Sequence, residues 1–296
     1  YNIPLWLINL WISEFGRDKT EDLCAWFNEQ PKLTARINTI LIDIPQCLTM
    51  LNEQGWAVTQ DSNYEDIIYI NSHRGSLEKS EAFIKGYITF MDKASMLVAR
   101  LVNPQPGERI LDCCAAPGGK SMYMATLMDN VGSLMSCDIH EHKIELMNSN
   151  AERLGASIVH TKVQDATKLP DSWNSYFDRV LVDAPCSGLG ILQKKLDMRW
   201  RKQESILSEL PSLQLAILER AAMTVKEKGY LIYSTCTLNY KENEEVVESF
   251  LQKHKEFSII PVADDFPLKS NSGMITTYPP IDDMDGFFMV KMQRIS

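Results

Sequence analysis

The chain has 296 residues, 45% of them hydrophobic, and carries 30 Lys and Arg against 39 Asp and Glu, a net charge of −9. This length fits about two domains with ordinary apolar cores. Phosphate contacts depend on Lys and Arg, so the acidic balance argues against a general affinity for nucleic acid. Any RNA contact would have to come from a local basic patch.

Cysteine usage and hydropathy bear on where the protein works. The longest uncharged run, residues 1–13, is shorter than the roughly 20 residues that span a bilayer, and no basic segment precedes it. Seven cysteines without a C-x-x-C pair favour neither a zinc ribbon nor a redox motif, and their odd number is typical of a reducing cytosol. We therefore expect a cytoplasmic monomer with no signal peptide, metal site or membrane contact. The absence of an initial Met indicates a trimmed or partial chain.

Residues 1–84 are predicted to form a small α+β module. Helical patterning runs to about Asn28, a strand-like segment begins at residues 35–39, a helix covers residues 45–54, and residues 67–70 form a short apolar strand. Short strands mixed with helices are typical of such a unit. The pattern alone predicts no function for it.

Residues 85–296 alternate between strand and helix patterns. This alternation predicts an α/β fold of the Rossmann-like kind, a mostly parallel sheet with helices on both faces. The predicted strands are 109–112, 132–138, 157–162, 178–183 and 229–235, and the predicted helices are 119–129, 140–154, 205–226 and 241–253. Two later segments, 256–260 and 286–292, could complete the sheet as an antiparallel edge.

The stretch ILDCCAAPGGKS, residues 110–121, joins the first predicted strand to a helix through a turn of small residues. Such a turn lets backbone N–H groups approach a ligand at the helix N-terminus. It matches neither the dinucleotide fingerprint G-x-G-x-x-G nor the phosphate loop G-x-x-x-x-G-K-[ST]. We therefore predict a cofactor loop whose ligand must be inferred from the other strand ends.

Acidic residues follow the next strands of the predicted sheet. Asp138 lies twenty residues after Gly118, a spacing at which an acidic residue commonly binds ribose hydroxyls; the alternative is an acid that caps the next helix. Asp165 either contacts an adenine or starts a turn. A nucleoside cofactor without a phosphate-binding motif points to S-adenosylmethionine, because small residues let the turn approach its methionine and ribose portions.

Cys186 and Cys236 end neighbouring predicted strands on the same rim. A buried cysteine is usually a small hydrophobe, but a thiolate also adds readily to an electron-poor ring carbon. Addition at carbon 6 of cytosine makes carbon 5 reactive toward a methyl group. Asp183, supported by Lys120, is placed to stabilise such an adduct at ring nitrogen 3, and a second thiol could assist loss of the carbon-5 proton. The turn at Asp183 lacks the aromatic residue of the N/D-P-P-Y/F turn, which counts against methylation of an exocyclic amine.

Four stretches resemble the Sun/nucleolar-protein family of RNA cytosine-5 methyltransferases. They are LDCCAAPGGKS (111–121), LVDAPCSGLG (181–190), YSTCTLNYKENEEVV (233–247) and DGFFMVKM (285–292). Residues 1–84 resemble the RNA-contacting module of the family more loosely, through residues 35–38. The layout is most similar to the bacterial 16S ribosomal RNA enzymes of the B type. An extra N-terminal helical domain, which resembles an antitermination factor in that type, has no counterpart in this sequence.

The resemblance implies an S-adenosylmethionine-dependent methyltransferase fold and a role for each matching residue. Asp138 would hold the ribose, Asp165 the adenine, and Asp183 would border both cofactor and base. The cofactor loop would comprise Cys114, Ala115, Ala116, Pro117, Gly118, Gly119 and Lys120. Cys236 would be the nucleophile, and Cys186 would help to release the product. DNA cytosine-5 methyltransferases instead take their nucleophile from the Pro-Cys turn, here Cys186, and pair it with a Glu-Asn-Val segment that this chain lacks.

A basic segment follows the Pro-Cys turn, and residues 194–202 carry a local charge of +4. A base extruded into a pocket needs phosphate anchors and stacking surfaces nearby, whereas the alternative is a solvated loop with its Trp packed inward. The candidate RNA-binding residues are Lys194, Lys195, Arg199, Trp200, Arg201 and, on the N-terminal module, Arg36. We predict an enzyme that methylates carbon 5 of a cytosine in 16S ribosomal RNA; the alternatives are the same chemistry on tRNA and a catalytically silent RNA-binding ribosome assembly factor.

Overall fold

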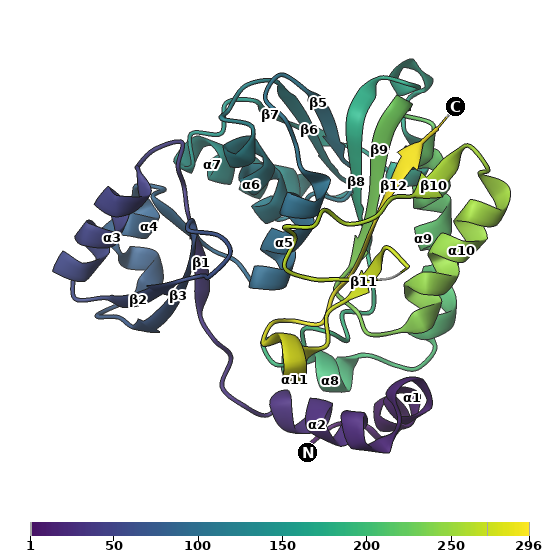
Figure 1. The fold of residues 1–296 in the computed structure, drawn as a ribbon, viewed down its shortest axis with the longest axis horizontal. Helices are drawn as coiled ribbons and strands as arrows, with labels where there is room; N and C mark the ends of the chain where they lie inside the picture. The colour runs from purple at the N-terminus through teal and green to yellow at the C-terminus, as the bar shows by residue number, and fades with distance from the viewer. Residues whose placement is uncertain (1, 271, 296) are drawn as a thin grey trace.

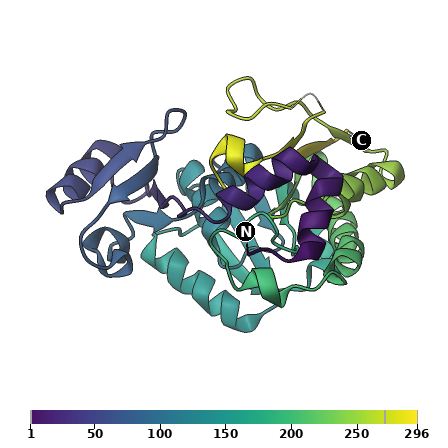
Figure 2. The same cartoon turned by 90° about the horizontal axis from the view of Figure 1, so that it is seen from below.

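The computed structural model describes residues 2–270 and 272–295. A small antiparallel sheet unit stands beside a larger α/β unit, and two N-terminal helices lie against the larger one (Figure 1). Seen from below, these helices run across the larger unit next to α11 (Pro279–Asp282) (Figure 2). None of the helices in the described part of the chain is long and apolar enough to cross a bilayer.

The two leading helices, α1 (Leu5–Phe15) and α2 (Arg17–Trp26), are separated at Gly16, whose φ of 81° ends the first helix. Their apolar faces do not pack on the small sheet. Leu7 and Trp11 instead join a cluster with Leu189 and Leu238, which follow the two candidate catalytic cysteines in the sequence. The leading helices therefore cover the loops that carry those cysteines.

The small sheet has the strand order β2-β3-β1-β4 and is antiparallel throughout. Its elements are β1 (Thr34–Ile37), α3 (Ile44–Glu53), β2 (Ala57–Gln60), β3 (Ile67–Ser72), α4 (Glu81–Ile84) and β4 (Ile88–Phe90). Because β4 pairs with β1, the small unit continues beyond the predicted boundary between residues 84 and 85. A strand of three residues is too short to show the alternation that would have revealed it.

The larger sheet has the order β10-β12-β9-β8-β5-β6-β7, with β11 paired to β12. Its strands are β5 (Arg109–Asp112), β6 (Ser133–Asp138), β7 (Val159–Val163), β8 (Phe177–Asp183), β9 (Val225–Thr235), β10 (Phe257–Ile259), β11 (Met274–Thr276) and β12 (Phe288–Arg294). The neighbouring strands β9, β8, β5, β6 and β7 all run parallel to one another. The strands beyond β9 are antiparallel, so the predicted antiparallel edge is confirmed.

Helices cover both faces of the larger sheet, because successive strand residues point to opposite sides. Ile110 and Ile232 pack with α5 (Lys93–Val102), α6 (Gly119–Leu127) and the end of α7 (Glu141–Arg153). Their chain neighbours Leu111 and Leu231 pack with α9 (Ile206–Ala222) and α10 (Glu244–Lys253) on the other face. The predicted Rossmann-like architecture, a mostly parallel sheet with helices on both faces, is confirmed.

Candidate active site

A cleft of about 470 Å³ lies at the carboxyl ends of the parallel strands. In doubly wound sheets this is the edge at which ligands bind. The cleft is lined by seven of the predicted site residues, namely Cys114, Ala116, Asp138, Asp165, Asp183, Cys186 and Cys236. The fold therefore brings together side chains that lie more than 100 positions apart in the sequence.

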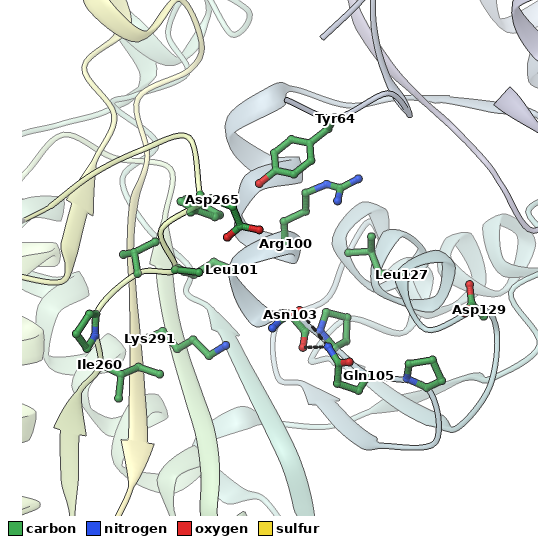
Figure 3. A pocket seen from close by; sticks show the side chains of 16 residues that line it. Tyr64, Arg100, Leu101, Asn103, Gln105, Leu127, Asp129, Ile260, Asp265 and Lys291 are labelled. Atoms are coloured by element: carbon green, nitrogen blue, oxygen red, sulfur yellow. Dashed lines mark hydrogen bonds between the residues drawn. The ribbon is translucent and has the colours of Figure 1, made fainter. Parts of the chain in front are cut away.

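A second cavity, of about 460 Å³, lies between α5, the loop after β10 and Lys291 of β12 (Figure 3). It is lined by residues 103–106 and Asp129, which lead into the amino ends of β5 and β6. None of the predicted site residues lines it. The two cavities are similar in size, so it is the position at the carboxyl ends of the strands that favours the first as the active site.

The predicted cofactor loop connects β5 to α6. Gly118 precedes the helix with a φ of 100°, in the left-handed region, and its N–H donates to the carbonyl of Ala115 at 2.7 Å. A Cβ atom added at Gly118 would lie 3.2 Å from Cγ of Met147 on α7. The turn therefore depends on Gly118 both for its backbone conformation and for its close packing against α7.

Asp112, the last residue of β5, is a buried carboxylate directly before this loop. Its Oδ2 accepts a hydrogen bond from Ser121 at 2.7 Å, whereas its Oδ1 accepts none from the residues that the structure describes. Burial and, to a smaller extent, the nearby Asp183 carboxylate raise its pKa to about 7. A cationic ligand group would favour the ionised form. Asp112 was not among the predicted site residues. Its position at the end of a predicted strand, where ligands bind, could have indicated it.

Asp138 and Asp165 both line the cleft and both also cap backbone turns. Asp138 accepts a hydrogen bond from the N–H of His140 at 3.0 Å. Asp165 accepts from the N–H and hydroxyl of Thr167, and these bonds lower its pKa. Asp165 therefore starts a turn, as its alternative predicts, whereas Asp138 bonds within the loop before α7 and does not cap that helix. The cofactor contacts of both residues stay predictions.

Lys120 and Asp183 form an ion pair between the cofactor loop and the end of β8. Lys120 Nζ lies 2.7 Å from Oδ2 of Asp183, and Ser234 donates to the other carboxylate oxygen at 2.8 Å. Burial alone would lower the pKa of Lys120, but Asp183, and to a lesser extent Cys236, hold it above its usual value. Lys120 is therefore a buried, permanently charged ammonium group whose charge acts on the sulfur of Cys236.

The two candidate cysteines both line the cleft and lie side by side. Their sulfur atoms lie 3.3 Å apart, and the N–H of Cys236 points to the sulfur of Cys186 at 3.4 Å. The hydrogen bond to Cys236 raises the pKa of Cys186 well above its ordinary value; burial and the negative charges of Cys236 and Glu242 add to the effect. Cys186 therefore favours its protonated form beside the sulfur of Cys236.

Two glycines allow the loops around the cysteines to meet backbone to backbone. The N–H of Gly190 donates to the carbonyl of Cys236 at 3.0 Å, and the N–H of Gly286 donates to the carbonyl of Gly190 at 2.9 Å. A Cβ atom on Gly190 would lie 1.8 Å from the oxygen of Gly286. The glycines of the GLG and DGFF stretches thus fix the backbone at Cys236, a role that sequence reasoning missed.

The profile of the 16S rRNA methyltransferase RsmB/F family matches residues 99–293. The chain belongs to this family. The ferredoxin-like domain of RsmF/B-like methyltransferases matches residues 3–75. The resemblance seen in the four sequence stretches is confirmed.

Individual relatives of this RsmB/F-family chain extend the match to almost its whole length. It is 37% identical, over 98% of its length, to the probable ribosomal RNA small subunit methyltransferase B of Bacillus subtilis, and 36% identical, over 99%, to that of Synechocystis. The chain spans 66% and 67% of the length of these two relatives.

Among solved structures, PH0851 is 32% identical to this RsmB/F-family chain and superimposes with a TM-score of 0.92. The match covers 98% of this chain and 66% of PH0851. NSun6 from Pyrococcus horikoshii, solved with SFG, is 22% identical and matches 99% of this chain and 98% of its own, with a TM-score of 0.90. Both likenesses support the fold.

Two of the predicted RNA-binding residues of this RsmB/F-family chain are buried, and those predictions are wrong. Arg36 lies between the small sheet and α6, where it donates to Thr126 at 3.1 Å and stacks over the ring of Tyr123. Arg199 donates to the carbonyls of Leu192 and Phe27 beneath α2. Arg36 is held by the Thr126 hydroxyl and the Tyr123 ring, and Arg199 by backbone carbonyls that include that of Phe27. A count of local charge cannot reveal such distant partners.

The other basic residues differ in their surroundings. Lys194 pairs with Asp92 and Asp285, so its charge is largely neutralised within the protein. Trp200 is 61% exposed, which contradicts the alternative of a Trp packed inward. Lys195 and Arg201 are also exposed. Met198, at the start of α8 (Met198–Arg201), lines the cleft. The exposed side chains therefore lie on a helical turn that borders the cleft, and their contact with RNA stays a prediction.

Proposed function

We propose that this chain transfers a methyl group from S-adenosylmethionine to carbon 5 of a cytosine in RNA, with 16S ribosomal RNA as the substrate. The observation that carries the proposal is the pair of thiols 3.3 Å apart, beside the Lys120–Asp183 ion pair. The family description and the names of the relatives in Bacillus subtilis and Synechocystis support methylation of small-subunit ribosomal RNA.

S-adenosylmethionine supplies a methyl group bound to a positively charged sulfur. The residues of the cleft fit such a cation, because Asp138 and Asp183 line it with carboxylates and Asp112 lies buried just before the cofactor loop. The Oδ1 of Asp112, which accepts no hydrogen bond from the described residues, would accept one from the ammonium group of the methionine portion. Asp138 would hold the ribose hydroxyls, Asp165 would face the adenine, and the turn at 114–119 would leave room for the backbone to approach the ligand.

Cys236 is the nucleophile in this proposal, and the local charges support that choice over Cys186. The ammonium of Lys120 interacts electrostatically with Cys236, and reactive cysteines lie in electropositive surroundings of this kind. The carboxylate of Glu242 acts on Cys186 and raises its pKa, after the larger effects of the bond to Cys236 and burial. We therefore assign the protonated thiol to Cys186. A thiolate at Cys236 adds to carbon 6, and Asp183, supported by its partner Lys120, stabilises the adduct at ring nitrogen 3.

Cys186 acts after the methyl group has moved. Once Cys236 is bonded to carbon 6 its sulfur is neutral, so one of the causes that raise the pKa of Cys186 disappears. Cys186 can then lose its proton to solvent and remove the hydrogen from carbon 5. The electrons of that carbon–hydrogen bond restore the carbon 5–carbon 6 double bond, and Cys236 leaves as a thiolate.

Bisulfite sequencing of RNA treated with the purified protein and S-adenosylmethionine tests the function directly. We expect one cytosine of 16S ribosomal RNA transcripts to become resistant to conversion, and tRNA to remain unmodified. Resistance in tRNA alone would assign the substrate to the tRNA alternative. No resistant cytosine in either RNA or in small-subunit particles would contradict the proposed chemistry.

Loss of the exposed side chains of Lys195, just before α8, and of Trp200 and Arg201 on α8 should weaken RNA binding without changing cofactor affinity. We expect the triple variant Lys195→Ala, Trp200→Ala, Arg201→Ala to lose about 1–3 kcal/mol of RNA affinity from the stacking surface. The two lost charges should also lower the salt slope of binding by about two. Filter binding at several salt concentrations measures both. The matched control is Lys253→Ala, Lys255→Ala, two exposed positions at the end of α10. If the two variants bind RNA with equal affinity, α8 has no role in RNA binding and is an ordinary surface helix.

A further inference from the structure

A buried carboxylate lies directly behind the two cysteines. Glu242, in the short turn η4 (Tyr240–Glu242), has no solvent exposure. It accepts hydrogen bonds from the N–H of Ser187 at 2.8 Å, from Gln214 at 2.9 Å and from Asn239 at 2.8 Å, and the Ser187 hydroxyl provides a fourth donor. Its position inside the protein is therefore defined by four contacts.

The charge of Glu242 is balanced only by these neutral donors. It forms no salt bridge with any residue in 2–270 or 272–295. An ionised carboxylate in the interior is strongly destabilising unless its lone pairs are satisfied. Its two oxygens offer about four acceptor sites, and all four donors are supplied. Loss of any one donor would leave a buried acceptor unsatisfied, so the surrounding loops are held in one arrangement.

Those donors come from both cysteine-bearing loops. Ser187 follows Cys186 directly, and Asn239 lies three positions after Cys236. The Ser187 hydroxyl also shares a hydrogen bond of 2.7 Å with the hydroxyl of Thr237, the neighbour of Cys236. Gln214 of α9, the third element, bonds to the carbonyl of Pro185 as well. Glu242 thus joins the chain on either side of Cys186 to the loop that carries Cys236.

We propose that Glu242 is a positioning residue that sets the separation and orientation of the Cys186 and Cys236 thiols. It does not touch the substrate; it acts through Ser187 and Asn239. The inference deepens the proposed function, since correct spacing of the two sulfurs is what allows one to attack carbon 6 and the other to take the carbon-5 proton. A purely structural role would instead stabilise the domain without affecting the relation between the sulfurs.

The separation of the sulfurs can be measured without RNA or cofactor. Diamide removes one hydrogen from each of two thiols and is itself reduced to the hydrazine, leaving a disulfide of about 2 Å. The wild-type sulfurs start 3.3 Å apart, so we expect rapid formation of a Cys186–Cys236 disulfide, detected by peptide mass spectrometry. In Glu242→Gln, which keeps the size but removes acceptors, we expect this rate to fall about tenfold.

Two further variants separate positioning from folding. Ser187→Ala removes a single hydroxyl donor to Glu242 and should reduce the disulfide rate in a folded protein; combined with Glu242→Gln it should add little, because both act through one contact. Glu14→Gln is the matched control, since Glu14 of α1 accepts from the N–H of Tyr240 in the same η4 turn at 3.1 Å but does not bond to either cysteine loop. It should keep the wild-type rate.

Steady-state kinetics provide the second readout. We expect Glu242→Gln and Ser187→Ala to lower kcat for methyl transfer while the KM for S-adenosylmethionine stays unchanged. Wild-type disulfide rates in both variants would overturn the positioning role, and so would an equal loss in Glu14→Gln. If the disulfide rates change as expected but the wild-type protein methylates no RNA, the positioning inference survives and only the proposed function fails.

Discussion

The Cys236→Ala variant is expected to lose methyl transfer by about 10⁴-fold or more, the scale on which removal of a covalent nucleophile acts, while still binding S-adenosylmethionine. Carbon 5 of cytosine is too weak a nucleophile to take the methyl group unless a thiolate first adds at carbon 6. Cys186 does not replace the lost thiolate, because burial and the Glu242 carboxylate, which the substitution leaves in place, still raise its pKa. The cofactor contacts proposed for Asp112 and Asp138 are unchanged by the substitution.

Tritium transfer from labelled S-adenosylmethionine measures the loss, and calorimetric titration of the cofactor shows whether the cleft is intact. Cys47→Ala is a suitable control, since Cys47 is fully buried in the core of the small unit, away from the cleft. The control should retain its activity if it folds. Turnover that persists in Cys236→Ala and disappears in Cys186→Ala would reverse the two roles and give the arrangement of the DNA enzymes.

Much of the fold followed from the sequence because its strands and helices alternate with clear hydrophobic periods. The parallel strand β5 was predicted with its observed bounds, 109–112. The site followed from topology rather than from local pattern. Since parallel strands place their carboxyl ends on one rim, Asp138, Asp183 and Cys236 could be expected in one cleft although nothing near them in the sequence links them.

Burial of polar groups could not be predicted in the same way, because it depends on partners that only the folded chain supplies. Arg199 was assigned to RNA from local charge, yet the carbonyl of Phe27, 172 positions away, accepts from it. Glu242 lies within a motif quoted for the family resemblance, but its role depends on Ser187, 55 positions away.

The Cys186→Ala variant is expected to have the opposite chemical outcome to Cys236→Ala, because it blocks the exit from the reaction rather than the entry. Cys236 keeps its neighbour Lys120, so addition to carbon 6 and methyl transfer can still occur. Without the second thiol the carbon-5 hydrogen has no nearby base, and the thiolate cannot be expelled. The methylated RNA should therefore stay covalently bound, and one turnover should convert most of the protein into the adduct.

Denaturing electrophoresis of the variant with labelled 16S ribosomal RNA should show a slowly migrating protein–RNA band. The band should require S-adenosylmethionine, because addition to an unmethylated base reverses freely when carbon 5 has gained no methyl group. The double variant Cys186→Ala, Cys236→Ala should give no band, which would place the bond on Cys236. If Cys186→Ala alone turns over normally and forms no adduct, another group takes the carbon-5 proton. The separation of 3.3 Å between the two sulfur atoms would then not reflect a role of Cys186 in product release.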